Sequence, residues 1–145
     1  MEHGRRCVLG GIEFACTTGP VGHSDGDAVL HAVCDAVLGA AGLDDLGSQF
    51  RDTDPRHAGR DSSEFCREVQ HQLAARGASL MSLDIVVEAE TPKIGPKRAA
   101  MREHIANLFG ITTDRVNVRG KTAEGLDAIG RGEAIRATAV ALLAV

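Results

Sequence analysis

The sequence predicts an α+β domain in which helices pack on one face of a mixed four-stranded sheet, a two-layer sandwich with a small N-terminal hairpin. Helical patterns, with apolar residues three or four apart, alternate with short strand-like runs along the chain. The hydrophobic fraction is 43% and the charged fraction 25%, as in ordinary globular proteins. The 145 residues are enough for one hydrophobic core, so we expect a single domain over residues 1–145.

Composition excludes two classes of partner. The net charge is −4, and aromatic residues make up 3% with no Trp or Tyr. The chain therefore lacks the positive field and the stacking platforms that nucleic-acid binding uses, and it has no attraction for anionic membranes. No signal peptide or long apolar segment is recognisable, so we expect a cytoplasmic protein. The four cysteines form no C-x-x-C pair and are predicted to be small buried hydrophobes.

The first half of the chain predicts a hairpin, a helix and a loop. Residues 5–16 are typical of two short strands around Gly10-Gly11. A largely buried helix is predicted from an N-cap at Ser24 to about Gly42. Residues 43–61 are polar, contain Gly and Pro, and are predicted to form a loop.

The second half predicts two helices and three strands. Asp61 or Ser62 opens a helix that ends at Gly77, and Pro96 lies in the first turn of another that ends at Gly110. The inner faces of these helices are Phe65, Val69, Leu73 and Met101, Ile105, Leu108, respectively. Strands are expected at 83–90, at 115–120 and over 133–145, with a Gly-rich turn and a short helix at 120–132. The last strand is almost wholly apolar, so we expect it to be central and covered on both faces.

Ionisable residues crowd the front of the first helix. Asp27, His31 and Asp35 are four residues apart and would form one stripe of acid, imidazole and acid. His31 is the best metal-ligand candidate, because neutral imidazole suits zinc and carboxylates orient ligating imidazoles. A satisfied core histidine is the alternative. A catalytic zinc needs three protein ligands, and this segment offers only His23 or Asp25 as further candidates.

Two other segments carry polar chemistry. FRDTDP (50–55) is either a turn stabilised by aspartate side chains or a site for polyol hydroxyls. KTAEGLDAIGR (121–131) places Lys121, Thr122 and Arg131 among glycines, which suits a phosphate, while Glu124 could hold magnesium. A loop with a solvated charge pair explains the second segment equally well.

Taken together, these segments resemble the 2-C-methyl-D-erythritol 2,4-cyclodiphosphate synthase family of the non-mevalonate isoprenoid pathway. The resemblance rests on GHSDGDAVLHAVCDAVLGAAGLDDLG, FRDTDP, GRDS, ETPKI, TAE and GRGEAI, in the family's order and spacing from Leu9 to the end. It implies a homotrimer with active sites between subunits, and zinc with magnesium or manganese as cofactors. It also implies that the 2-phosphate of 4-diphosphocytidyl-2-C-methyl-D-erythritol 2-phosphate attacks the β-phosphorus and releases CMP.

The resemblance also implies roles for individual residues. His31 would bind zinc, Glu124 would bind magnesium, and His23 and Thr122 would act on the reacting phosphates. Asp27, Asp35 and Ser62 would support the site, with Ser62 near a mobile loop. Pro92 and Lys93 would bind cytidine in the adjacent subunit. The remaining substrate-binding residues would be Asp45, Gly47, Phe50, Arg51, Asp52, Thr53, Asp54, Lys121, Ala123 and Arg131.

The sequence departs from the family pattern at its first strand. The family's other zinc ligands form an Asp-x-His pair that would lie just upstream of Met1, and the adjacent Glu2 and His3 would point to opposite faces of a strand. Three hypotheses follow: a misassigned start or fragment, a divergent non-catalytic paralogue that binds a nucleotide or prenyl diphosphate, or the tail of a fusion with a cytidylyltransferase. Arg51, Lys121, Ala123, Asp127 and Ala128 also replace the usual family residues.

Overall fold

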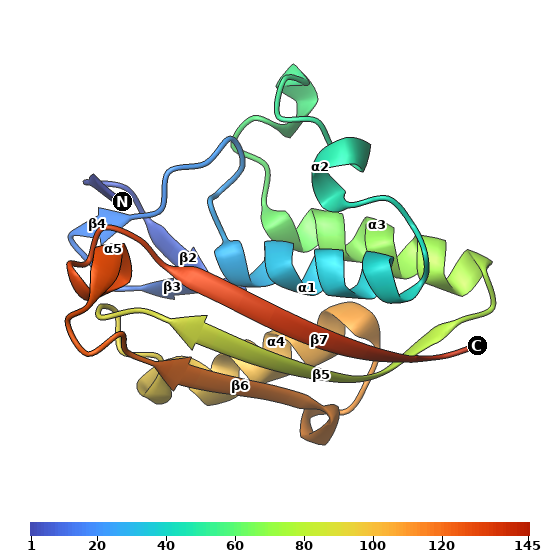
Figure 1. Ribbon diagram of the computed structural model, residues 1–145. Helices are drawn as coiled ribbons and strands as arrows, with labels where there is room; N and C mark the ends of the chain where they lie inside the picture. The colour runs from blue at the N-terminus through green and yellow to red at the C-terminus, as the bar shows by residue number, and fades with distance from the viewer.

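A mixed three-stranded sheet carries the three long helices on one face (Figure 1). In the computed structural model, which describes residues 1–145, β5 (Ser79–Glu88) lies in the centre. It pairs in parallel with β6 (Val116–Lys121) and antiparallel with β7 (Arg136–Ala144). Helices α1 (Ala28–Ala40) and α4 (Arg98–Phe109) contact the sheet, and α3 (Ser62–Ala75) packs against both helices. The predicted α+β class is confirmed.

The N-terminal residues form two small antiparallel pairs beside the main sheet. Strands β2 (Cys7–Leu9) and β3 (Ile12–Phe14) make the predicted hairpin around Gly10-Gly11. Both glycines have positive φ, +62° and +76°, a backbone conformation that side chains disfavour. Strand β1 (Glu2–His3) pairs with β4 (Thr18–Gly19), an element that the sequence did not predict.

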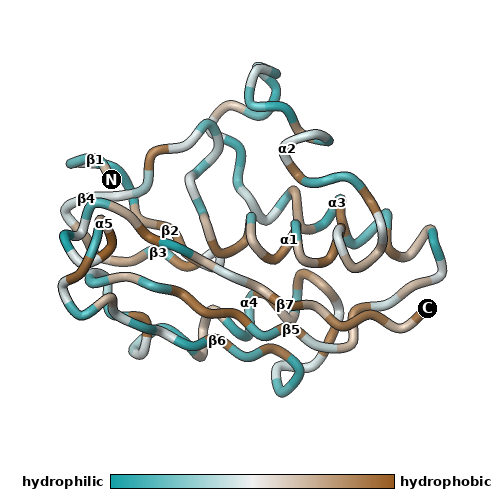
Figure 2. Tube along the Cα trace, viewed as in Figure 1, coloured by the Kyte–Doolittle hydropathy of each residue, from teal (hydrophilic) through white to brown (hydrophobic).

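Two predictions about the sheet were wrong. The main sheet has three strands, not four, and β7 lies at its edge instead of its centre. Val140 and Leu142 of β7 remain 67% and 63% exposed, and hydrophobic residues colour the C-terminal half of the strand brown in Figure 2. An apolar run indicates that both faces of a strand are buried by other residues. It does not indicate whether those residues belong to the same chain or to another copy.

Short helices interrupt the segments that were predicted as loops. Helix α2 (Leu46–Gln49) and a 3-10 turn (Pro55–His57) lie within residues 43–61. Helix α5 (Asp127–Gly130) lies in the Gly-rich segment, as expected. Two further 3-10 turns, Gly95–Lys97 and Thr113–Arg115, flank α4.

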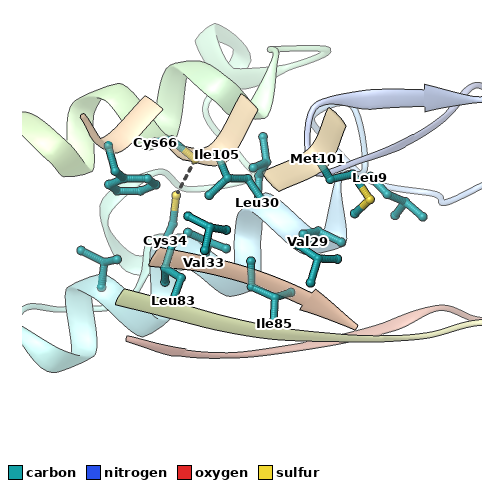
Figure 3. Close-up of a cluster of buried hydrophobic side chains, with 14 of the residues drawn as sticks. Leu9, Val29, Leu30, Val33, Cys34, Cys66, Leu83, Ile85, Met101 and Ile105 are labelled. Atoms are coloured by element: carbon teal, nitrogen blue, oxygen red, sulfur yellow. Dashed lines mark hydrogen bonds between the residues drawn. The ribbon is translucent and has the colours of Figure 1, made fainter. Parts of the chain in front are cut away.

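One hydrophobic core joins the hairpin, the helices and the sheet. Figure 3 shows residues of these elements meeting there, among them Leu9, Val33, Ile85 and Ile105. Cys34 and Cys66 face each other with their sulfur atoms 3.4 Å apart, and this contact, with burial, raises the pKa of the Cys66 thiol. Cysteine burial is confirmed for Cys7, Cys34 and Cys66, whereas Cys16 is only half-buried.

The inner faces of the helices follow the predicted pattern with one exception. Phe65, Val69 and Leu73 of α3 are buried. In α4 the last buried residue is Phe109, whereas the predicted Leu108 is half-buried. Gly110 ends this helix in the left-handed conformation, as the sequence indicated.

The start of α1 also differs from prediction, because Asp27 and not Ser24 is its N-cap. The Asp27 carboxylate is fully buried and accepts four backbone N–H bonds, from Gly10 (2.9 Å), Gly11 (2.7 Å), Val29 (3.1 Å) and Leu30 (3.0 Å). Burial raises the pKa of Asp27 to about 6. The hydrogen bonds from the backbone N–H groups lower the pKa and so offset part of this effect. The expected stripe is therefore split: the Asp27 carboxylate binds the hairpin turn, whereas the His31 ring contacts Ser24 and Ser62.

None of the helices has both the length and the apolar character needed to cross a bilayer.

Replacing Asp27 should destabilise the fold strongly. We expect Asp27→Ala to lower the free energy of unfolding by about 3 kcal/mol, since it leaves buried N–H groups in both the hairpin turn and α1 unpaired. Urea unfolding followed by circular dichroism measures this. The exposed Asp44 provides the control variant Asp44→Ala, and equal losses in the two variants would contradict the prediction.

Candidate functional site

A cavity of about 400 Å³ opens between the start of α1, helix α2 and the segment that follows α2. Three imidazoles line it, those of His23, His31 and His57. Its other lining side chains include two carboxylates and two phenyl rings: Asp35, Asp52, Phe50 and Phe65. The cavity thus combines groups that bind anions or metals with an apolar wall.

His31 is held by hydroxyl groups from two elements. Its Nε2 atom lies 3.1 Å from Ser62 Oγ and 3.2 Å from Ser24 Oγ. The Ser62 hydroxyl donates to Asp25 Oδ1 at 2.5 Å, and the Ser62 N–H donates to Asp25 Oδ2 at 3.1 Å. Because the single Ser62 proton goes to Asp25, Ser62 Oγ accepts from His31 Nε2–H. The lone pair on Nδ1 of His31 is then left for a ligand.

The electrostatics of the cavity also favour a neutral His31 ring. Burial lowers the pKa of His31, and the carboxylates of Asp25, Asp35 and Asp52 raise it only in part. A neutral imidazole whose second nitrogen is fixed by a hydrogen bond is the form that binds zinc. No group of three or more His, Cys, Asp or Glu side chains that could hold a metal ion is present around it, so these residues alone do not form a complete zinc site.

Helix α2 is fixed by two aspartates that the sequence analysis selected. Asp35 Oδ1 accepts from the Leu46 N–H at 2.8 Å, and Asp45 caps the helix by accepting from the Ser48 N–H at 2.7 Å. The hydrogen bonds from Ser48 lower the pKa of Asp45. Gly47 of this helix lines the cavity, whereas Asp45 acts from outside it.

The FRDTDP segment contributes to the same cavity only in part. Phe50 and Asp52 line the cavity, whereas Arg51 and Thr53 are exposed outside it. The Asp54 carboxylate caps the 3-10 turn, and the Arg56 guanidinium holds the pKa of Asp54 well below its usual range. The Asp54 carbonyl accepts from His23 Nε2–H at 3.2 Å, so His23 has its Nε2 occupied and its Nδ1 available.

A second, smaller cleft of about 290 Å³ lies at the carboxyl ends of β5 and β6. Pro92, Lys93, Lys121 and Thr122 line it. Gly120 is required there, because a Cβ at this position would lie 2.8 Å from Ile94 Cβ. This cleft brings the predicted nucleotide residues together with two of the predicted phosphate residues, Lys121 and Thr122.

The loop that carries Glu124 is shaped by a residue that the sequence analysis did not select. Glu90 Oε1 accepts from the N–H groups of Ala123 (3.0 Å) and Gly125 (3.2 Å). Glu124, between them, has a φ of +52° and an exposed carboxylate. Arg131 lies beyond this loop and pairs with Glu133 at 3.0 Å.

The structure therefore places some of the predicted site residues on two concave surfaces, which share no lining residue, whereas Asp45, Arg51 and Arg131 line neither of them. His57 and Phe65 of the cavity wall, and Glu90 beside the cleft, were missed. His57 follows FRDTDP by two residues, and that proximity was the one available signal.

The comparisons with known proteins agree on one family. The family model described as the YgbB family matches residues 1–144. The 2-C-methyl-D-erythritol 2,4-cyclodiphosphate synthase of Bordetella avium (strain 197N) is 49% identical over 141 residues, which are 97% of this chain and 87% of that protein. The bifunctional enzyme IspD/IspF of Anaeromyxobacter sp. (strain Fw109-5) is also 49% identical, over 97% of this chain and 36% of its own length.

Solved structures are similar over the same length. A 2C-methyl-D-erythritol-2,4-cyclodiphosphate synthase in a CDP-bound form has a TM-score of 0.90 and 41% identity, covering 99% of this chain and 93% of that one. The CDP complex of IspF from Plasmodium falciparum has a TM-score of 0.84 and 30% identity, covering 98% and 85% of the two chains.

The link between Asp25 and Ser62 should contribute measurably to stability. We expect Ser62→Ala to lower the free energy of unfolding by about 1–2 kcal/mol, because the buried hydroxyl joins Asp25 to His31. Urea titration of this variant beside Ser79→Ala, which removes an exposed hydroxyl, tests the prediction. A Ser62→Ala protein as stable as the control would rule it out.

Proposed function

The chain belongs to the YgbB family, and we propose that it is the enzyme that converts 4-diphosphocytidyl-2-C-methyl-D-erythritol 2-phosphate into 2-C-methyl-D-erythritol 2,4-cyclodiphosphate and CMP. This is a phosphorus–oxygen lyase of isoprenoid biosynthesis. The relatives carry the enzyme's name at nearly full coverage of this chain, and nothing favours the non-catalytic alternative. The observation that carries the proposal is the pairing of a His-lined cavity with a separate Lys- and Thr-lined cleft.

The reaction needs positioning more than a protein nucleophile. An oxygen of the 2-phosphate attacks the β-phosphorus, the bond from that phosphorus to the oxygen of CMP breaks, and an eight-membered ring closes. His23 would face the reacting phosphates through Nδ1, since its Nε2–H donates to the Asp54 carbonyl. His23 would stabilise the charge that develops there. Thr122 donates from the cleft side.

Each concave surface would take a different part of the substrate. Asp45, Gly47 and the 50–54 segment would form the methylerythritol side, with Asp35 and Ser62 as supports. Pro92 and Lys93 would hold the cytidine, because the cleft combines basic side chains with the apolar side chains of Ile94 and Pro96. Lys121, Ala123 and Arg131 would contact the phosphates. The CDP-bound relatives support a nucleotide ligand of this kind.

Metal ions would be shared between the same residues and the phosphates. His31 would supply one zinc ligand through Nδ1. The residues around it do not supply the further ligands that a zinc site needs. Glu124, an exposed carboxylate on the cleft side, would hold Mg2+ or Mn2+. Divalent cations at these points neutralise phosphate charge.

A homotrimer would bring the two surfaces together. The outer face of β7 presents Val140 and Leu142 to solvent, and burying them against another copy gains about 2 kcal/mol for each side chain. The cavity of one subunit would then meet the cleft of its neighbour, which explains why neither surface alone holds every predicted residue.

Loss of the His31 imidazole should abolish turnover without unfolding the protein. We expect His31→Ala to release CMP from the diphosphocytidyl substrate at least about 100-fold more slowly, with less bound zinc by elemental analysis. Its oligomeric mass should stay unchanged. The exposed His71 gives the control His71→Ala, and full activity in the His31 variant would remove this residue from the site.

The cleft makes a separate prediction. Lys93→Ala should raise the KM for the diphosphocytidyl substrate and the Kd for CMP about 10-fold, because one cationic contact is lost, while kcat changes little. Isothermal titration with CMP measures the second value directly. The control is Arg76→Ala, which removes an exposed cation outside the residues that line the cleft. Unchanged CMP affinity in Lys93→Ala would argue against nucleotide binding in the cleft.

A further inference from the structure

His57 is the third imidazole in the wall of the cavity, and the proposed reaction does not use it. Its side chain is only 12% exposed. The ring packs edge-on against both Phe50 and Phe65, with centroid distances of 5.7 Å to each, at 81° and 67°. The two phenyl rings are themselves 5.0 Å apart. His57 therefore closes a three-ring cluster that joins its own 3-10 turn to α3 and to the end of α2.

The hydrogen bonds of His57 fix its tautomer as well as its place. Nδ1 lies 3.2 Å from Arg60 Nη1, and a guanidinium can only donate. Nδ1 therefore accepts, the ring is neutral, and its proton is on Nε2, 3.7 Å from Asp54 Oδ2. Arg60 is itself held over the Phe65 ring at 4.9 Å and pairs with Glu64 and Glu68 of α3.

The segment that His57 anchors is the one that orients His23. The Asp54 carbonyl accepts from the His57 N–H at 3.0 Å and from His23 Nε2–H at 3.2 Å. The backbone continues the connection, since Gly59 N–H donates to the His23 carbonyl at 2.8 Å. Residues 21–23 are exposed and lie outside any helix or strand, so these contacts are what hold the His23 side chain in place.

We propose that His57 is a positioning residue: as a ring packed against both Phe50 and Phe65, it holds residues 54–59 so that the Asp54 carbonyl fixes the His23 imidazole toward the reacting phosphates. The kinetic part of this inference rests on the proposed function. The placement of His23 does not, and it can be measured without substrate.

The experiment compares four versions of the full protein: the unchanged chain, His57→Ala, His57→Phe and the exposed control His71→Ala. Two-bond proton–nitrogen spectra of histidine-labelled protein report the tautomer of each ring, and a His23→Gln sample assigns the His23 signals. His57→Asn removes the ring but keeps an acceptor for Arg60, and it provides the same comparison if the alanine protein does not fold.

We expect His57→Ala to convert His23 from a single Nε2–H tautomer to a mixture, and to lower kcat about 10-fold with KM within about threefold. His57→Phe keeps an aromatic ring packed against Phe50 and Phe65 and should restore both the tautomer and most of kcat. A His23 spectrum unchanged by His57→Ala or His57→Asn overturns the proposal, as does a His57→Phe protein no better than His57→Ala. If the unchanged chain releases no CMP, the proposed function fails while the spectra still decide the role of His57.

Discussion

The buried carboxylate of Asp27 is the constraint from which the cavity is built. Four backbone N–H groups, two from the hairpin turn and two from the first turn of α1, converge on it. A buried carboxylate is costly unless it is bonded in this way, so the hairpin and the helix have to meet at this point. The position of α1 on the sheet, and with it the direction of His31, follows from that junction.

Asp25 and Asp27, two residues apart in the HSDGD segment, make contacts with two different parts of the fold. Asp27 turns inward to the hairpin, whereas Asp25 turns toward α3 and binds both the hydroxyl and the N–H of Ser62. Gly26 between them has a φ of +76° and a Cβ there would lie 2.9 Å from the Pro20 carbonyl oxygen, so this turn requires glycine. One acid fastens α1 to the hairpin; the other fastens it to α3 and sets the His31 ring.

Local patterns were enough to predict the long elements, but not the choice among competing polar groups. Phe65, Val69 and Leu73 defined the inner face of α3, and Gly110 defined the end of α4, because each depends on neighbours within a few residues. Ser24, Asp25 and Asp27 are all good caps by type, and only the distant Gly10-Gly11 turn selects Asp27. His57 was missed for the same reason: its partners Phe50 and Phe65 come from two other elements. The edge position of β7 depends on what covers it, which no periodicity within the strand reports.

The exposed face of β7 and the division of polar residues between two surfaces have one common explanation. The central strand is β5, and β7 keeps Val140 and Leu142 outward. Exposed apolar side chains on an edge strand are a liability unless a partner covers them. A second copy of the chain is the proposed partner, and the face that it covers is also the face that would bring cavity and cleft together. Assembly and catalysis would then both depend on β7. A chain that could not associate would keep its fold, but its cavity and cleft would no longer form one active site.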